Sequence, residues 1–480
     1  MPYLKLSLII FCFSALLSGC QPLEMSKIYQ KLPVSIGGIV GEAESTVAVE
    51  SSQNTLEDNG DANRDSNSLI SLIDQSTPSV DVDKGFAEAI RSAVDADPSI
   101  IAGRADLLAK KVGVEVFEKG KEFNVSGMLL GGIENLSDEQ AGLAAVLSAN
   151  RMVYDGGQID AQVLSESLSA EAAEFALTAN TNKRAAELAS IWIDLERYRA
   201  LKKLIDDRLE ILNPLIVKLE QVAEAGMGDM AQVSAAQRTV SIIKATQLEV
   251  SESLELAILD FKNSFGAVPS VTGYDSNFID NLMPISISSE MEQNSPALLS
   301  AYATYRSLQA SVAVIEARDS VSVGFEARAT LPVGDSSADR EERIGLVLQK
   351  TIYNGKIIET EVEGAKARVS AALSNVKAVY REGLRQVNSA SKTVASMDSA
   401  ILLAKTNAKI TSDEIVYLRK QLIIGGSTLD EVLSAEARLY DAESKEINFT
   451  SEKRKAQLAI LGSLGLFASG IGLSVGSSGD

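Results

Sequence analysis

The chain has 480 residues, 45% of them hydrophobic, and a formal net charge of −20. This acidic balance argues against a nucleic-acid partner, because a protein that neutralises phosphates needs a basic face. There is no histidine, which excludes His-based triads and His metal sites. The two cysteines, Cys12 and Cys20, lie within the first twenty residues, so the rest of the chain has no thiol chemistry. No carboxylate pair stands out from solvated helical faces. We therefore predict a protein that is not an enzyme, with no catalytic residue, metal site or cofactor.

The first twenty residues resemble a bacterial lipoprotein signal. Lys5 is followed by an apolar stretch of twelve residues, 6–17, whereas a bilayer span needs about 20. The segment Leu17–Cys20 reads Leu-Ser-Gly-Cys, with small residues before the cysteine at the end of the stretch. The resemblance implies cleavage before Cys20 and lipid attachment to it. Because Gln21 rather than Asp follows, delivery to the outer membrane is favoured. The alternative is an ordinary signal peptide with an incidental cysteine.

A polar, acidic stretch follows the predicted signal peptide of residues 1–19. From Glu42 to Asp83 large apolar residues are few and have no steady period. Such a composition cannot bury enough apolar surface to fold by itself. We predict that residues 20–83 form a flexible, lipid-anchored tether.

The remainder of the chain is a tandem repeat. Three segments recur in the same order: Val153–Gly156 as Ile352–Gly355, Gly226–Ala236 as Gly425–Ala435, and Ser264–Gly266 as Ser463–Gly465. Each pair is offset by 199 residues (352 − 153, 425 − 226 and 463 − 264). Three separated segments in one register indicate a duplication. The predicted organisation is a first repeat at 84–266, a crossover at 267–296, a second repeat at 297–466 and a flexible tail at 467–480.

Each repeat is predicted to begin with a helix and two strands. The clearest strand, Val321–Leu331, alternates strictly between an apolar face and a polar face that carries Glu326 and Arg328. This period of two is typical of a strand with only one apolar side. The expected ranges are helices at 86–118 and 297–318, and strand pairs at 123–131 with 143–154 and at 321–331 with 344–349.

A very long helix follows each predicted strand pair. From Lys356 to Ile424 there is no proline, and these residues would extend about 100 Å as a helix. Helices of that length must pack as coiled coils. In the first repeat Pro214 predicts a kink or a break. The only tryptophan, Trp192, is expected in the core. Each long helix is predicted to reverse at a glycine tip, and the return helices end at Gly266 and Gly465.

The ordered set of motifs resembles the TolC family of outer-membrane efflux proteins. The segments that carry the resemblance are Tyr154–Gly157, Tyr353–Gly355 and the two tips, Ala225–Ala236 and Ile424–Arg438. The second tip matches the family's G-x-x-T-x-x-x-V-L-x-A segment at Gly425, Thr428, Val432, Leu433 and Ala435. The resemblance covers about residues 84–466. No single motif is specific, and it is their ordered duplication that indicates the family.

The resemblance implies an α+β fold made mainly of long α-helices, assembled as a homotrimer. Each chain would give four strands to a shared outer-membrane β-barrel and its long helices to a periplasmic α-helical coiled-coil barrel. Physical reasoning agrees, because strands with one polar face span a membrane only in a closed barrel, and two hairpins cannot close one alone. Glu326 and Arg328 would then face the lumen.

The implied function is the exit channel of a tripartite efflux or type I secretion system, through which cargo leaves passively. The implied partners are a periplasmic adaptor protein, an inner-membrane transporter and outer-membrane lipid. The alternative is a non-conducting, lipid-anchored coiled-coil stalk or scaffold. That alternative explains the helices and the lipid, but not the amphipathic strand pairs at equal positions in both repeats.

The two tips are the predicted adaptor contacts and periplasmic mouth. The residues expected to contact the adaptor are Gly226, Met227, Gly228, Gly425, Gly426 and Thr428. Glu431 stands where the family has a carboxylate that narrows the mouth, and Ser434 stands where a second would be. Asp430 lies beside Glu431 and represents the ordinary alternative to a pore carboxylate. An acidic residue in the first turn of a helix ordinarily complements the helix dipole.

Overall fold

The computed structural model describes residues 80–132, 142–226, 230–270, 277–333 and 340–473, which belong to one compact unit. Cys20, the predicted signal peptide, almost all of the predicted tether, and the tip residues Met227 and Gly228 lie outside the described residues.

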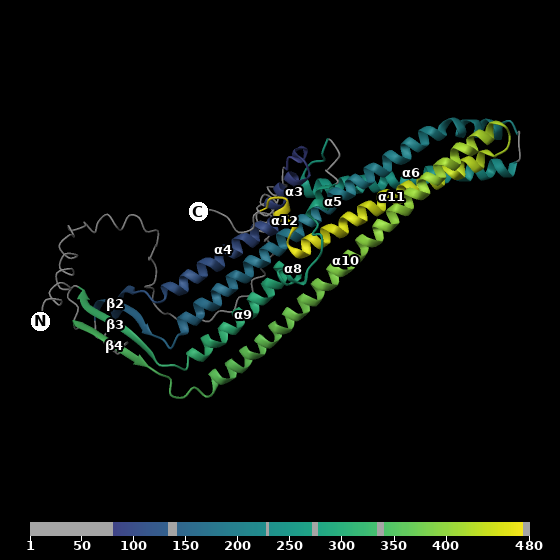
Figure 1. Cartoon of the computed structure of the whole chain (residues 1–480). Coiled ribbons are helices and arrows are strands. Elements are labelled where there is room, and N and C mark those ends of the chain that lie inside the picture. The colour runs from purple at the N-terminus through teal and green to yellow at the C-terminus, as the bar shows by residue number, and fades with distance from the viewer. Residues whose placement is uncertain (1–79, 133–141, 227–229, 271–276, 334–339, 474–480) are drawn as a thin grey trace, which may run out of the picture. The chain divides into compact units, whose positions relative to one another are not determined.

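Long helices dominate the described chain, and a small antiparallel sheet accompanies them (Figure 1). The first repeat contains α3 (Phe86–Asp95), α4 (Pro98–Lys119), β1 (Asn124–Gly132), β2 (Gly142–Tyr154), α5 (Gln158–Glu224) and α6 (Met230–Phe265). The crossover contains α7 (Asn277–Leu282) and α8 (Ser289–Gln293). The second repeat contains α9 (Pro296–Ala317), β3 (Ser322–Val333), β4 (Glu341–Gln349), α10 (Ile357–Ile423), α11 (Leu429–Leu464) and α12 (Phe467–Gly470). The predicted α+β class with mainly long helices is confirmed.

Corresponding helices of the two repeats have equal lengths. Helices α4 and α9 each have 22 residues, α5 and α10 each have 67, and α6 and α11 each have 36. Within each repeat the long helix packs against its return helix, and α11 also packs against α5 (Figure 1). At 1.5 Å per residue, α10 carries the chain about 100 Å from β4 to the second tip.

Two of the predicted helices differ from the structure. The first helix is divided into α3 and α4, because Pro98 begins α4 and the Asp97 carboxylate accepts the Ser99 amide at 2.9 Å as an N-cap. Conversely, α5 continues through Pro214, so of the predicted kink or break the break does not occur. Proline removes one backbone hydrogen bond, but Leu212 and Ile216 on either side of it are buried in the core between α5, α6 and α11.

Segments expected to be flexible are packed at both ends of the described unit. Val80 and Val82, placed in the tether, and Phe467 and Leu473, placed in the tail, are buried in the same core. The Arg91 guanidinium fixes the C-terminal segment by donating from Nε and Nη2 to the Ile471 carbonyl, at 3.1 and 2.7 Å. The packed unit therefore extends to residue 473, and the flexible-tail prediction is wrong for residues 467–473.

Trp192 lies at the centre of this core, as predicted, and is 2% exposed. Its ring makes edge-on contacts with Phe86, Phe261 and Phe265, with centroid distances of 5.7, 5.1 and 5.9 Å. Pairs of this kind add about 0.5–1.5 kcal/mol beyond area burial. The core thus joins α3, α5 and α6.

Candidate functional site

The four strands form one sheet in the order β1-β2-β3-β4, and all neighbours are antiparallel. The pairing of β2 with β3 joins the hairpins of the two repeats, so the duplication produces a single sheet. In the part of the chain that the structure describes, β1 and β4 are edge strands with one partner each. Edge strands present unpaired backbone N–H and C=O groups, which favour the addition of another strand.

One face of the sheet is apolar and exposed. Residues directly opposite one another in an antiparallel pair share a face, and the register places Phe325 opposite Leu346 and Ala327 opposite Ile344. Leu346 and Ile344 are 69% and 77% exposed. Further members of this face are Val125, Leu129, Leu143, Leu147 and Leu331. Soluble monomers rarely expose a contiguous apolar surface of this kind, so this face requires an apolar environment.

The opposite face is polar, and it carries both Glu326 and Arg328. A Glu326 carboxylate oxygen lies 3.3 Å from an Arg343 guanidinium nitrogen on β4. The hydroxyls of Ser126 and Ser148 are hydrogen-bonded at 2.9 Å across β1 and β2. The separation of apolar from polar side chains is clearest along β3, whereas β1 and β2 also place Met128 and Val146 on the polar face.

The second tip is a tightly hydrogen-bonded turn between α10 and α11. Gly425 has a φ of +78°, in the left-handed region, where glycine is free of strain. The Gly426 amide donates to the Gln421 carbonyl at 2.9 Å, and the Ser427 hydroxyl donates to the Leu418 carbonyl at 2.8 Å. The described part of the first tip ends at Gly226, whose φ of +62° is also left-handed.

Glu431 and Asp430 have different surroundings from those expected. Glu431 forms a capping box with Thr428: the Thr428 amide donates to the Glu431 carboxylate at 2.8 Å, and the Glu431 amide donates to the Thr428 hydroxyl at 3.2 Å. Asp430 instead lies 3.5 Å from the Thr239 hydroxyl on α6. Asp430 remains in the first turn of α11, as the helix-dipole role requires, while Glu431 closes the cap and is exposed to solvent.

A buried ion-pair cluster lies two turns behind the second tip. Glu436 on α11 is 1% exposed and accepts from Arg208 of α5 at 2.9 Å and from Arg419 of α10 at 2.5 Å. Arg208 also donates to Glu443 at 2.6 Å. The cluster joins three helices, and the sequence analysis missed it. The available signal was the spacing of seven residues between Glu436 and Glu443, which places both carboxylates on one side of α11.

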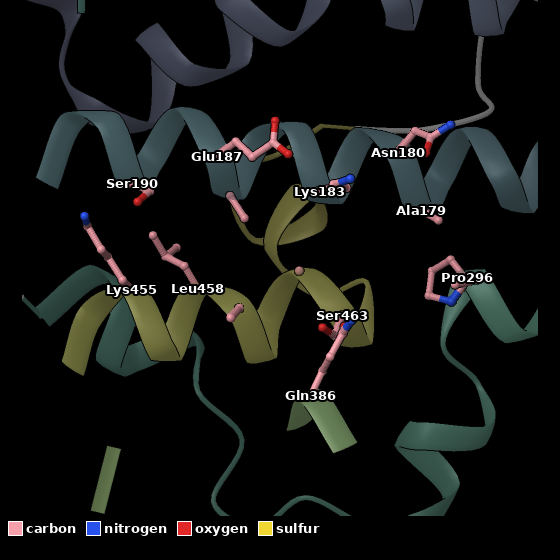
Figure 2. Close-up of a pocket in the computed structure, with 14 residues that line it drawn as sticks. Ala179, Asn180, Lys183, Glu187, Ser190, Pro296, Gln386, Lys455, Leu458 and Ser463 are labelled. Atoms are coloured by element: carbon pink, nitrogen blue, oxygen red, sulfur yellow. The ribbon is translucent and has the colours of Figure 1, made fainter. Parts of the chain in front are cut away.

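A groove with mixed polar and apolar lining lies between α5 and α11, with a volume of about 550 Å³ (Figure 2). Lys183 and Glu187 come from α5, and Lys455 and Leu458 come from α11. Lys455 is ion-paired with Asp194 of α5. No nucleophile and base are hydrogen-bonded to each other among the residues lining this groove, so its contacts join helices rather than assemble a catalytic site.

Two further features concern the described residues alone. They include no cluster of three or more acidic side chains arranged to hold a metal ion. None of their helices combines the length and apolarity needed to cross a bilayer.

Comparison with known proteins identifies the same architecture in outer-membrane channels. The family model described as "Outer membrane efflux protein" matches residues 287–466, which include the whole second repeat. A search of curated proteins found no match.

Solved structures of channels share the fold over most of the chain. CusC matches with a TM-score of 0.68 at 13% identity, covering 80% of this chain and 92% of that one. VceC from Vibrio cholerae matches with a TM-score of 0.67 at 16% identity, covering 79% and 96%. The open state of the MtrE outer membrane channel of Neisseria gonorrhoeae matches with a TM-score of 0.67 at 14% identity, covering 82% and 91%. These relatives are channel proteins and not enzymes. The second repeat therefore matches the outer-membrane efflux protein family, and the described chain has the fold of TolC-like channel structures.

Proposed function

We propose that three copies of the chain form an outer-membrane channel that gives cargo a passive exit from a tripartite efflux or type I secretion system. The observation that carries this proposal is the sheet, which has one exposed apolar face, one polar face and two open edges. Strand β4 of one copy can pair antiparallel with β1 of the next, and a sheet closed in this way leaves no edge in lipid. The polar face, with Glu326 and Arg328, would then line a water-filled lumen.

Uncovered helical faces support assembly from copies of the same chain. On α10 and its C-cap, exposed apolar residues recur every seven residues: Leu403, Ile410 and Tyr417 on the helix, and Ile424 at the cap. On α6, Ile242, Leu248, Leu256 and Leu259 are exposed. A spacing of seven is typical of a coiled-coil seam. Since α6 packs on α5 and α10 packs on α11, we infer that the α10 seam of one copy meets α6 of the next.

The α10 seam can be tested by a pair of adjacent substitutions. Ile410→Glu should convert trimers to monomers, because an unpaired carboxylate would be buried between helices. Lys409→Glu changes a neighbouring exposed residue and should leave trimers intact. Light scattering of the detergent-purified protein measures the mass. Trimers in both variants would exclude α10 from the subunit contact, and a wild type that is monomeric in membranes would contradict the proposal itself.

The tips are the proposed docking site for the periplasmic adaptor, whose inner-membrane transporter partner delivers the cargo. Ile423 and Ile424 are strongly exposed at the second tip, and exposed apolar residues in a group indicate a partner surface. Gly226, Gly425, Gly426 and Thr428 shape the two tips, and Met227 and Gly228 complete the proposed contact. Glu431, repeated in three copies, is proposed as the periplasmic constriction.

The lipid anchor rests on the Leu-Ser-Gly-Cys sequence that ends at Cys20. Mass spectrometry of the mature protein should find an N-terminal Cys20 that carries acyl chains, and Cys20→Ser should lack them. Several chains together hold a protein at a membrane far more stably than one. An unmodified mature N-terminus in the wild type would contradict the anchor and leave the channel proposal standing.

A further inference from the structure

A row of four polar residues crosses the whole sheet on its polar face. Ser126 lies opposite Ser148, Ser148 lies opposite Arg328, and Arg328 lies opposite Arg343. Because directly opposed residues share a face, one hydroxyl or guanidinium from each strand projects from the same side of the sheet. All four side chains can donate hydrogen bonds, and none of them is a carboxylate. We refer to these four residues as the donor row.

The direct opposition of Arg328 and Arg343 is electrostatically unfavourable. Like charges opposite one another destabilise a pair of strands. Glu326 relieves only one of the two arginines, since its carboxylate lies 3.3 Å from the Arg343 guanidinium. In the described part of the chain, no carboxylate lies within 4.0 Å of the Arg328 guanidinium. The planar donors of Arg328 therefore have no carboxylate partner among the described residues, and Arg328 lies between Ser148 and Arg343 in the register.

We propose that the donor row is a binding site for soluble oxyanions of the phosphate or sulfate type. A guanidinium donates two parallel hydrogen bonds to such an anion, which makes arginine well suited to bind it. A second guanidinium across the strand pair would neutralise further charge, and a bound anion would relieve the repulsion between the two arginines. The serine hydroxyls extend the same line of donors.

The position of the row determines where its ligand comes from. The exposed leucines and isoleucine of β3 and β4 lie on the other face, so a lipid headgroup and its acyl chains would lie on the side away from the row. The ligand is therefore an anion dissolved in the water on the polar face. This step rests on the proposed channel, in which three donor rows would lie at one level of the barrel and the three Glu431 carboxylates would lie at the far end of the helices.

The test measures binding without requiring conductance. Inorganic pyrophosphate is titrated calorimetrically into the purified, detergent-solubilised full-length protein in a chloride buffer. The wild type should bind it, and Arg328→Gln should weaken binding by about tenfold or more, as expected for the loss of a charge-assisted bidentate contact. Arg340→Gln is the matched control: it removes the same charge from the same hairpin, but Arg340 is paired with Glu342 at 2.6 Å and lies outside the row. Its affinity should equal that of the wild type.

The other outcomes distinguish a failure of the donor row from a failure of the proposed channel. Absence of pyrophosphate binding to the wild type, or equal affinity in Arg328→Gln, would overturn the donor row as a site. Displacement of pyrophosphate by phosphatidylglycerol micelles would show that the row accepts lipid headgroups and would overturn the soluble ligand. A protein that binds pyrophosphate as expected, but never conducts ions in planar bilayers, would contradict the channel and leave the site intact.

Discussion

Leu346→Arg should block assembly of the barrel, whereas Val347→Arg, in the next residue of the same strand, should be tolerated. Leu346 is on the exposed apolar face, and Val347, 48% exposed, is on the polar face. An arginine on the lipid side of a membrane strand costs about 2–4 kcal/mol near the bilayer midplane, and a trimer would incur this cost in every copy. On the polar face the same arginine would stay in water.

The measurement for this pair is the fraction of each variant recovered as trimer from outer membranes. The wild type and Val347→Arg should give similar fractions, and Leu346→Arg should give almost none. Both variants add one arginine to the same strand. They differ in the face of the sheet that carries the new charge. Equal recovery of the two would mean that the apolar face does not meet lipid.

Glu436→Gln should destabilise the helices behind the second tip by about 1–3 kcal/mol. The glutamine is neutral and cannot replace the charge-assisted bonds to Arg208 and Arg419, so Arg208, whose side chain is 13% exposed, keeps Glu443 as its one carboxylate partner. A lost hydrogen bond between buried charged groups is more costly than a lost surface pair. The matched control is Asp441→Asn on the same helix. Asp441 pairs with Lys445 at 2.6 Å in an exposed position, and pairs of this kind contribute about 0.3–0.5 kcal/mol.

Urea unfolding followed by circular dichroism gives the urea concentration at which half of each variant is unfolded. Amide hydrogen exchange in the first turns of α11 measures the loss of stability near the cluster. Exchange in these turns should accelerate strongly in Glu436→Gln and remain unchanged in Asp441→Asn. Combining Glu436→Gln with Arg208→Gln should cost less than the sum of the two single changes, because each change removes a partner of the other residue. Similar midpoints for Glu436→Gln and the wild type would contradict a structural role for the cluster.

Features with a strong local period could be predicted from the sequence. The strict alternation of Val321–Leu331 identified β3 to within two residues at each end. The first hairpin has a weaker alternation, and it was predicted because the chain repeats with an offset of 199 residues. The Thr428–Glu431 capping box could also have been read from its T-x-x-E spacing. The resemblance to the TolC family predicts a pore carboxylate at Glu431, and the structure adds a helix-capping role for the same residue.

Features that depend on distant pairing could not be predicted. The Arg208–Glu436 contact joins residues 228 positions apart, and each residue alone looks like part of a solvated helical face. The donor row requires the β2–β3 register, which is set by the packing of two repeats rather than by either hairpin. In the tail, the glycines and serines favoured a prediction of flexibility. The apolar residues Phe467, Ile471 and Leu473 between them are nevertheless buried in the core of the same unit.

The central claim is that the assembled chain conducts through a mouth bordered by Glu431. Three carboxylates in a narrow ring repel one another and attract cations. Glutamine at this position still accepts the Thr428 amide, so Glu431→Gln removes the charge while keeping the cap. Asp430→Asn, beside Thr239, is the control that removes a neighbouring charge.

The most direct measurement is the conductance of purified trimers in planar bilayers. The account predicts a small, cation-preferring conductance that trivalent cations block from the side of the helical tips. Glu431→Gln should weaken both the preference and the block, and Asp430→Asn should change them little. Gly425→Val should raise the conductance, because valine is strained at a φ of +78° and should loosen the tip. If correctly assembled trimers of the wild type and of Gly425→Val never conduct, the channel claim is contradicted and the chain is a lipid-anchored stalk.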